Sequence, residues 1–128
     1  MILYIICNMD SEIGILLGES APCNINQLLE SIFWKEKKLA PKANKLLKHI
    51  REWSRTQKPY TTDEWSRYCA KNNISQSSYH NMLKRLRKAK MIEKRYNKHN
   101  KKHELHLTDG FSELMFKQGN LWESFLRE

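Results

Sequence analysis

The sequence predicts a mainly α-helical α+β fold, in which a few short strands accompany amphipathic helices. Apolar residues recur at helical spacing over most of the chain, and the two-residue alternation typical of strands is confined to short stretches. The composition, 40% hydrophobic with only 4 Gly and 3 Pro among 128 residues, is that of an ordinary folded protein. A chain of this length forms one domain with room for a short extension.

Residues 1–40 are expected to form a β-hairpin followed by a helix. Two short apolar runs, 3–6 and 13–17, flank turn-forming residues, which is the pattern of a hairpin. From residue 25 the apolar residues follow helical spacing, and Asn24 is the expected N-cap. Pro41 lies close to the point where the charge of the chain changes sign, so we place a boundary there. The segment is predicted as an acidic, apolar extension that contacts the rest of the chain or a second subunit.

Three helices are predicted next. The first covers residues 43–53. Thr61 and Glu64 have the spacing of a capping box and predict the start of a second helix, which ends near residue 72. Ser75 is the expected N-cap of a third helix that extends to residue 90. Because only two or three residues separate the second and third helices, they have the sequence shape of a helix-turn-helix.

A β-hairpin and a C-terminal helix complete the chain. Residues 92–96 and 103–107 alternate with the two-residue period of strands, and the residues between them are polar and basic. Apolar residues return at helical spacing from Phe111, and Gly119 with Asn120 is expected to interrupt them. The prediction therefore divides the chain into an extension, a main domain and a final helix, which cover residues 1–40, 41–116 and 117–128.

Basic residues are concentrated in the third helix and the hairpin. The chain has a net charge of +9, yet residues 1–34 contain no lysine or arginine. Residues 75–103 contain ten basic residues and one acid, Glu93. Such a density is typical of a surface that binds a polyanion. No apolar run is long enough to cross a bilayer and no signal peptide is seen, so we expect no membrane partner and a cytoplasmic, nucleoid-associated location.

The order of the elements resembles that of the winged helix-turn-helix superfamily, especially the small transcription regulators of archaea and bacteria. The resemblance covers residues 42–116 and is carried by ISQSSYHNMLKRLRKAKMIEK at 74–94 and HELHLTDGF at 103–111. It implies sequence-specific binding of double-stranded DNA. The helix at 75–90 would enter the major groove, and the wing at 92–107 would contact the backbone.

Helical geometry selects the candidate contacts on the third helix. At 100° per residue, the side opposite its apolar face carries small hydroxyl, amide and basic side chains, which suit base edges and phosphates. The residues expected to approach bases are Gln76, Ser77, His80, Asn81 and Lys84. The residues expected to contact the phosphate backbone are Arg85, Lys88, Lys98, Lys101 and Lys102.

Other interpretations stay open at this point. The same module could serve in DNA replication or in a mobile element, or it could bind RNA or another protein. His99, His103 and His106 crowd the hairpin, but residues 103 and 106 point to opposite faces of a strand, so we expect no metal and no cofactor. No catalytic signature is found, so we expect no enzymatic activity. The three cysteines include no C-x-x-C pair and predict free thiols.

The end of the chain favours a homodimer. Leu121, Trp122, Phe125 and Leu126 are large apolar residues in a last helix, where little core is left to join. The segment Gln118–Leu126 also resembles the peptide by which replication proteins hold a sliding clamp, with one extra residue before Phe125.

Overall fold

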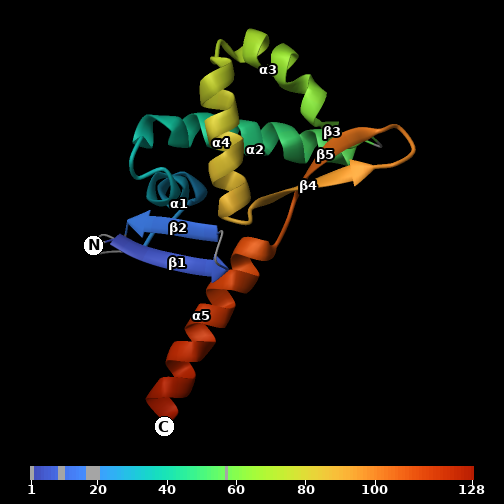
Figure 1. Cartoon of the computed structure of the whole chain (residues 1–128). Coiled ribbons are helices and arrows are strands. Elements are labelled where there is room, and N and C mark those ends of the chain that lie inside the picture. Colours follow the sequence, from blue (N-terminus) through green and yellow to red (C-terminus); the bar gives the residue numbers. More distant parts are fainter. Residues whose placement is uncertain (1, 9–10, 17–20, 57) are drawn as a thin grey trace.

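The computed structural model describes residues 2–8, 11–16, 21–56 and 58–128 and has an α+β fold (Figure 1). The described residues form five α-helices, five strands and two short 3₁₀ turns. In chain order these are β1 (Ile2–Asn8), β2 (Ser11–Leu16), α1 (Ile25–Ile32), η1 (Lys37–Leu39), α2 (Ala40–Arg55), β3 (Tyr60–Thr61), η2 (Thr62–Glu64), α3 (Trp65–Asn72), α4 (Gln76–Lys88), β4 (Ile92–Asn97), β5 (Lys102–Leu107) and α5 (Gly110–Arg127).

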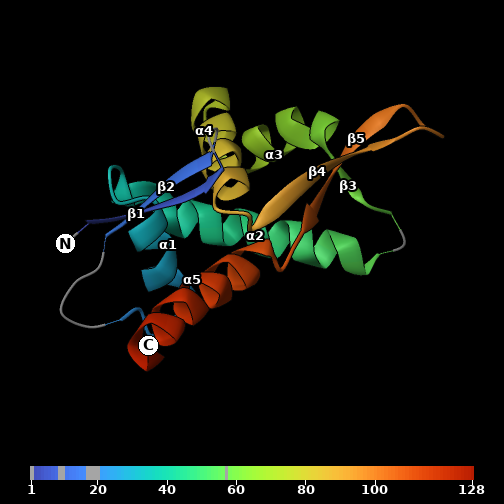
Figure 2. The ribbon, with the colours of Figure 1, turned by 60° about the horizontal axis from the view of Figure 1, so that its bottom comes forward.

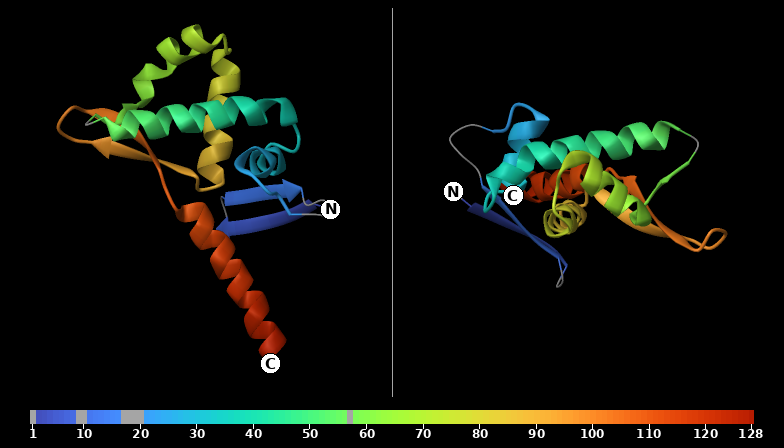
Figure 3. Two further views of the ribbon diagram at one scale, coloured as in Figure 1. Left: turned by 180° about the vertical axis from the view of Figure 1, so that it is seen from behind. Right: turned by 90° about the horizontal axis from the view of Figure 1, so that it is seen from above.

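The strands form two antiparallel sheets. β1 pairs with β2, with Ile5 opposite Ile13, so the predicted N-terminal hairpin is confirmed; part of its predicted turn, residues 9 and 10, lies outside the described residues. The second sheet has the order β3–β5–β4. It contains the predicted basic hairpin and one strand that the sequence did not predict, β3, in which Tyr60 lies opposite Leu105. In every view α4 lies between the two hairpins (Figures 1, 2 and 3).

One apolar core joins α1 to the helices that follow it. Leu29 and Ile32 of α1 are buried in the same cluster as Leu46 of α2 and Met82 of α4. α1 therefore makes the intramolecular contact that was one of the two possibilities for the extension. The change of charge near residue 40 falls between two helices that share this core.

The helix ends follow the predicted capping residues in two places. Asn24 caps α1, because its Oδ1 accepts a hydrogen bond of 2.8 Å from the backbone N–H of Gln27. Ser75 caps α4, and its Oγ accepts a bond of 3.1 Å from the N–H of Ser78. α3 ends at Asn72, and its C-cap residue Asn73 has the left-handed conformation, with φ 52°, which turns the chain toward α4.

Two predicted details are wrong. Thr61 does not form a capping box with Glu64, and its hydroxyl instead donates to the carboxylate of Asp63. Thr61 is held in strand β3, so the chain tightens into η2 before α3 begins at Trp65. Gly119 does not interrupt the last helix, because α5 is continuous to Arg127. A helical glycine costs only about 1 kcal/mol relative to alanine, which the rest of a long helix can offset.

The start of α5 is bonded to the turn that follows α4. The N–H of Phe111 donates to the carbonyl of Lys90 at 2.9 Å, and the N–H of Thr108 donates to the carbonyl of Met91 at 3.0 Å. A Cβ on Gly110 would lie 3.1 Å from both Cβ and carbonyl oxygen of Lys90, so glycine permits this close approach. Asp109 is the N-cap residue of α5, but its side chain makes no cap bond.

Candidate nucleic-acid interface

α4 has the two faces that its sequence predicts. Tyr79, Met82 and Leu86 are fully buried and attach the helix to the core. The five residues expected to approach bases are all exposed on the remaining surface: Gln76, Ser77, His80, Asn81 and Lys84. Polar side chains able to hydrogen-bond therefore line the outer side of this helix.

The N-terminus of α4 is suited to an anion. The Ser75 cap satisfies the N–H of Ser78, and helix geometry leaves the N–H groups of Gln76 and Ser77 without an intrahelical acceptor. Such groups, with the positive end of the helix dipole, attract a phosphate. Nearby, the ring of His80 lies against Trp65 of α3, with 6.0 Å between the ring centroids.

Two hollows flank the C-terminal half of α4. The larger, of about 670 Å³, lies between α4, the start of β4 and the start of α5. The smaller, of about 250 Å³, lies between α4 and the segment that joins α1 to α2, and it includes Asn81 and Lys35. Lys84 and Lys88 line both hollows, so they form the ridge between them. The basic residues of the larger hollow are Lys84, Arg87, Lys88, Lys90 and Lys94.

Four of these basic residues were not predicted as contacts: Lys35, Arg87, Lys90 and Lys94. The density of bases between residues 84 and 94 was a signal for three of them. Their meeting in space depends on the turn at Lys90, which has a left-handed φ of 60° and brings β4 back beside α4.

One face of the β4–β5 hairpin is turned toward α4. Leu105 of β5 lies opposite both Tyr60 of β3 and Lys94 of β4. The Tyr60 hydroxyl is bonded to the hydroxyl of Tyr79 on α4, with 2.7 Å between the oxygens. Because alternate residues of a strand share a face, the outer part of this face is formed by Lys94, Tyr96 and His103.

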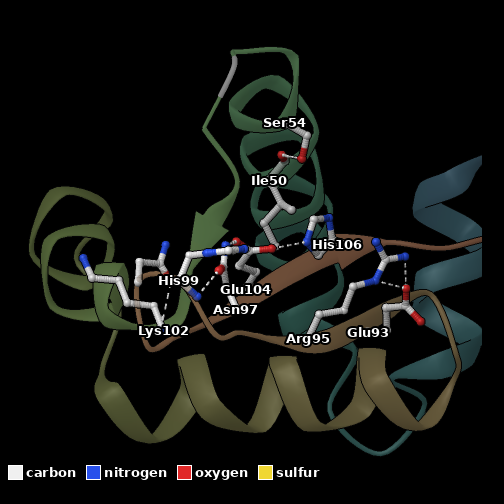
Figure 4. A network of polar contacts seen from close by, with 10 residues as sticks. Ile50, Ser54, Glu93, Arg95, Asn97, His99, Lys102, Glu104 and His106 are labelled. Atoms are coloured by element: carbon white, nitrogen blue, oxygen red, sulfur yellow. Dashed lines mark hydrogen bonds and ion pairs between the residues drawn. The ribbon is translucent and has the colours of Figure 1, made fainter.

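The opposite face of the hairpin is held by a polar network (Figure 4). Glu104 is buried and accepts hydrogen bonds from Asn97 Nδ2 at 2.8 Å and His106 Nε2 at 2.9 Å. These two bonds lower the pKa of the Glu104 carboxyl below its usual value. Arg95 and Glu93 form an ion pair on the same face. The network fixes the shape of the hairpin that carries the exposed bases.

The tip of the hairpin presents two predicted contacts. Lys98 and Lys101 are exposed and make no ion pair with the described residues. The turn between them is shaped by asparagine side chains, since Asn97 Oδ1 accepts from the N–H of His99 and Asn100 Oδ1 accepts from the N–H of Lys102.

Two residues predicted to contact the phosphate backbone also have partners within the chain. Arg85 is half-buried, and its Nη2 donates to the carbonyl of Ile32 at 2.5 Å, where α1 ends and carbonyls lack helical partners. Burial lowers the pKa of its guanidinium. Lys102 Nζ lies 3.2 Å from Asp63 Oδ2 on η2. Arg85 thus joins α4 to α1, and Lys102 joins the hairpin to η2, so each of these two predicted phosphate contacts already has a partner within the chain.

Comparison with known proteins assigns the chain to a family. A model that describes an archaeal family matches residues 22–127. The chain belongs to this archaeal family. The segment of the chain that matches the archaeal family runs from just before α1 into the last turn of α5. It contains all ten predicted site residues. No curated protein and no solved structure matches the chain.

Two further properties of this member of the archaeal family concern metals and membranes. Among the described residues, no group of three His, Cys, Asp or Glu side chains could hold a metal ion. His103 and His106 lie on opposite faces of β5, as expected. No helix within the described ranges combines the length and apolar character needed to cross a membrane.

Proposed function

We propose that this protein is a sequence-specific double-stranded DNA-binding protein of the winged helix-turn-helix type and that it acts as a transcription regulator. α4 enters the major groove, and the β4–β5 hairpin, the wing, contacts the backbone. One observation carries the proposal. The polar face of α4, the larger hollow beside it and the side of the wing that faces α4 are contiguous.

The outer face of α4 supports reading of bases. Asn81 is exposed on this face, and an amide can pair with both N6 and N7 of adenine in the major groove. Lys84, one turn further, can donate to O6 and N7 of guanine. Gln76 and Ser77 lie at the helix N-terminus, where a helix approaches base edges and phosphates together.

The bases around α4 support the backbone contacts. Lys88 lies beside the base-reading residues, and Lys98 and Lys101 extend the basic surface to the wing tip. The larger hollow adds Arg87, Lys90 and Lys94. If about six phosphates are neutralised, the logarithm of affinity should fall with the logarithm of salt concentration at a slope near −5.

The test is a charge reversal on the ridge between the hollows. Duplex DNA selected from a random pool is titrated with wild type and with the variant Lys84→Glu/Lys88→Glu. We expect at least about 100-fold weaker binding, since each of these side chains is worth about 1–3 kcal/mol at the interface. The control variant Lys45→Glu/Lys71→Glu makes the same charge change at a hollow lined by α2 and α3 residues only. It should bind the selected DNA far more tightly than the Lys84→Glu/Lys88→Glu variant does. Circular dichroism verifies the fold of both variants.

Several results would contradict the proposal. Wild-type affinity in the Lys84→Glu/Lys88→Glu variant would exclude α4 as the docking helix. A pool that yields no consensus would exclude sequence specificity, and a preference for competitor RNA would exclude duplex DNA as the ligand. Genomic footprints at a replication origin instead of promoters would assign the same interface to replication.

A further inference from the structure

Helix α5 carries an apolar stripe that the described part of the chain does not cover. Phe111, Leu114 and Met115 in its first turns pack against the core. The same face then continues at seven-residue spacing along the part of α5 that leaves the body of the molecule (Figures 1 and 3). The residues of this C-terminal stripe, each 58–66% exposed, are Leu121, Trp122, Phe125 and Leu126.

A second apolar surface lies at the base of the same helix. A hollow of about 460 Å³ is formed between α1, α2 and the start of α5, and its apolar lining includes Leu28, Leu47 and Phe111. Ile25 and Leu107 line it as well and are exposed, by 46% and 37%. The C-terminal stripe and this basal hollow contain six of the eight large exposed hydrophobic side chains among the described residues.

We propose that two copies of this chain pair through antiparallel α5 helices, so that the C-terminal stripe of each copy covers the basal hollow of the other. The helix has 18 residues and is about 27 Å long. In an antiparallel pair, the end of one helix lies beside the start of the other. The hollow borders the start of α5 at Phe111, which belongs to the same helix face as the stripe. A two-fold axis then relates two equivalent contacts, each between the stripe of one copy and the hollow of the other.

Charge favours a second copy as the occupant. Residues 117–128 contain two basic residues, Lys117 and Arg127, and two acids, Glu123 and Glu128, in a chain of net charge +9. Arg127 and Glu123 also pair within the helix, at 3.8 Å. This end of α5 is therefore neutral on balance. The hollow that it covers in the partner is lined by two bases, Lys48 and Arg51, so a neutral helix end meets it without strong repulsion.

The apolar area is sufficient for a dimer. A large side chain that is about 60% exposed offers on the order of 100 Å² for burial, so the two stripes contribute roughly 800 Å². The two hollow linings add a smaller area, so the total is on the order of 1,000 Å², which is the lower bound for a specific interface.

The first test compares two phenylalanines of the same helix. The full-length chain is studied by sedimentation over a range of concentrations, and wild type should be dimeric. Phe125→Ser should raise the dimer dissociation constant at least about 100-fold, because the two-fold axis counts each substitution twice. Phe116→Ser is the matched control: Phe116 is 71% exposed but lies on a different side of α5, so this variant should remain dimeric.

The second test concerns the basal hollow. Ile25→Ser, at an exposed first position of α1, should weaken the dimer as well. When the Ile25→Ser and Phe125→Ser chains are mixed, they should form a heterodimer with a lower dissociation constant than either variant homodimer. One of its two contacts, between an unchanged stripe and an unchanged hollow, is then intact. If Ile25→Ser has the dimer dissociation constant of wild type, the stripe does not cover the basal hollow.

Other outcomes would overturn the dimer itself. A monomeric wild type, or a Phe116→Ser variant that dissociates as strongly as Phe125→Ser, would contradict it. A monomeric chain that sediments with anionic lipid vesicles would assign the stripe to a membrane surface. None of these measurements uses DNA, so their failure is separate from failure of the proposed function.

Discussion

Arg85 connects two helices through one charged hydrogen bond. Its bond to the Ile32 carbonyl spans 53 positions of sequence and satisfies a group at the end of α1. We expect Arg85→Ala to lower the free energy of unfolding by about 1.5–3 kcal/mol in urea denaturation. Lys84→Ala, at the exposed neighbouring position, should change it by less than about 0.5 kcal/mol. If both variants lose the same free energy of unfolding, the bond from Arg85 to Ile32 does not stabilise the fold.

The ring of His49 is half-buried among aromatic side chains of α2, β3 and α3. Its ring lies between those of Tyr68 and Trp53, with centroid distances of 4.9 Å and 5.6 Å. Burial lowers the pKa of His49 below the ordinary 6.5, and the positive charge of Lys71 lowers it further, while Glu64 acts in the opposite direction. The folded chain therefore disfavours the protonated imidazole.

This shift predicts a loss of stability in mild acid. Because the pKa of His49 is lower in the folded chain, the unfolded chain binds more protons as pH falls below 6.5. The stability from the neutral ring is complete above pH 6.5 and is lost as pH falls through the folded pKa. The melting temperature should fall between about pH 7.5 and pH 5, and less so in His49→Gln. An NMR titration midpoint of His49 above 6.5 would contradict the prediction.

At the residue scale, the sequence identifies which side chains face outward. It does not identify which of them have a partner elsewhere in the chain. The outward positions of Asn81 and Lys84 follow from helical periodicity alone, and they are correct. The same periodicity placed Arg85 on a flank. Its partner lies on α1, a contact that no local pattern encodes. Lys102 is the same case, since Asp63 reaches it only after β3 joins the sheet.

Among the elements, β3 and α4 are joined by a buried pair of tyrosines. Tyr60 and Tyr79 are fully buried with their hydroxyls bonded, and burial raises the pKa of both. Tyr79→Phe leaves the Tyr60 hydroxyl without this partner and should cost about 1–3 kcal/mol. The double variant Tyr60→Phe/Tyr79→Phe should be more stable than Tyr79→Phe alone, which a double-mutant cycle in urea measures. Additive losses would contradict the pairing.

The elements were predictable where a local signal repeats. The helices show apolar spacing, and the caps at Asn24 and Ser75 are short-range bonds that the sequence specifies directly. β3 has two residues, too few for any period, and it exists because β5 offers it an edge. The same strand prevents the capping box expected at Thr61. The continuity of α5 through Gly119 does not follow from local signals, because a single glycine costs a helix only about 1 kcal/mol and the neighbouring turns can offset it.

At the scale of the whole molecule, the basic surface around α4 and the apolar surface of α5 lie on different elements. Bases line α4, the turn at Lys90 and the β4–β5 hairpin, and further exposed bases lie along α2. Most of the large exposed apolar residues lie on α5 and around the basal hollow, which Lys48 and Arg51 of α2 also line. Composition alone showed the excess of bases, and the fold shows that one hollow collects residues from α4, β4 and α5. DNA binding and pairing of two copies can therefore use separate surfaces.

We expect added salt to stabilise the folded chain and to weaken DNA binding. Self-repulsion of a chain with net charge +9 decreases as salt shortens the Debye length to about 10 Å at 0.1 M. The free energy of unfolding should rise by on the order of 1 kcal/mol between low and high salt, which corresponds to about 4 °C in melting temperature. A slope near −5 means that a tenfold rise in salt weakens DNA binding by about 10⁵.

The control reduces charge at the wing tip, where no ion pair with the described residues is broken. Lys98→Gln/Lys101→Gln lowers the net charge from +9 by two, so the stabilisation by salt should shrink. The same variant should show a less steep salt slope for DNA, by about one for each phosphate that is no longer neutralised. A wild-type melting temperature that falls with salt would mean that ion pairs such as Lys102 with Asp63 outweigh the repulsion between bases.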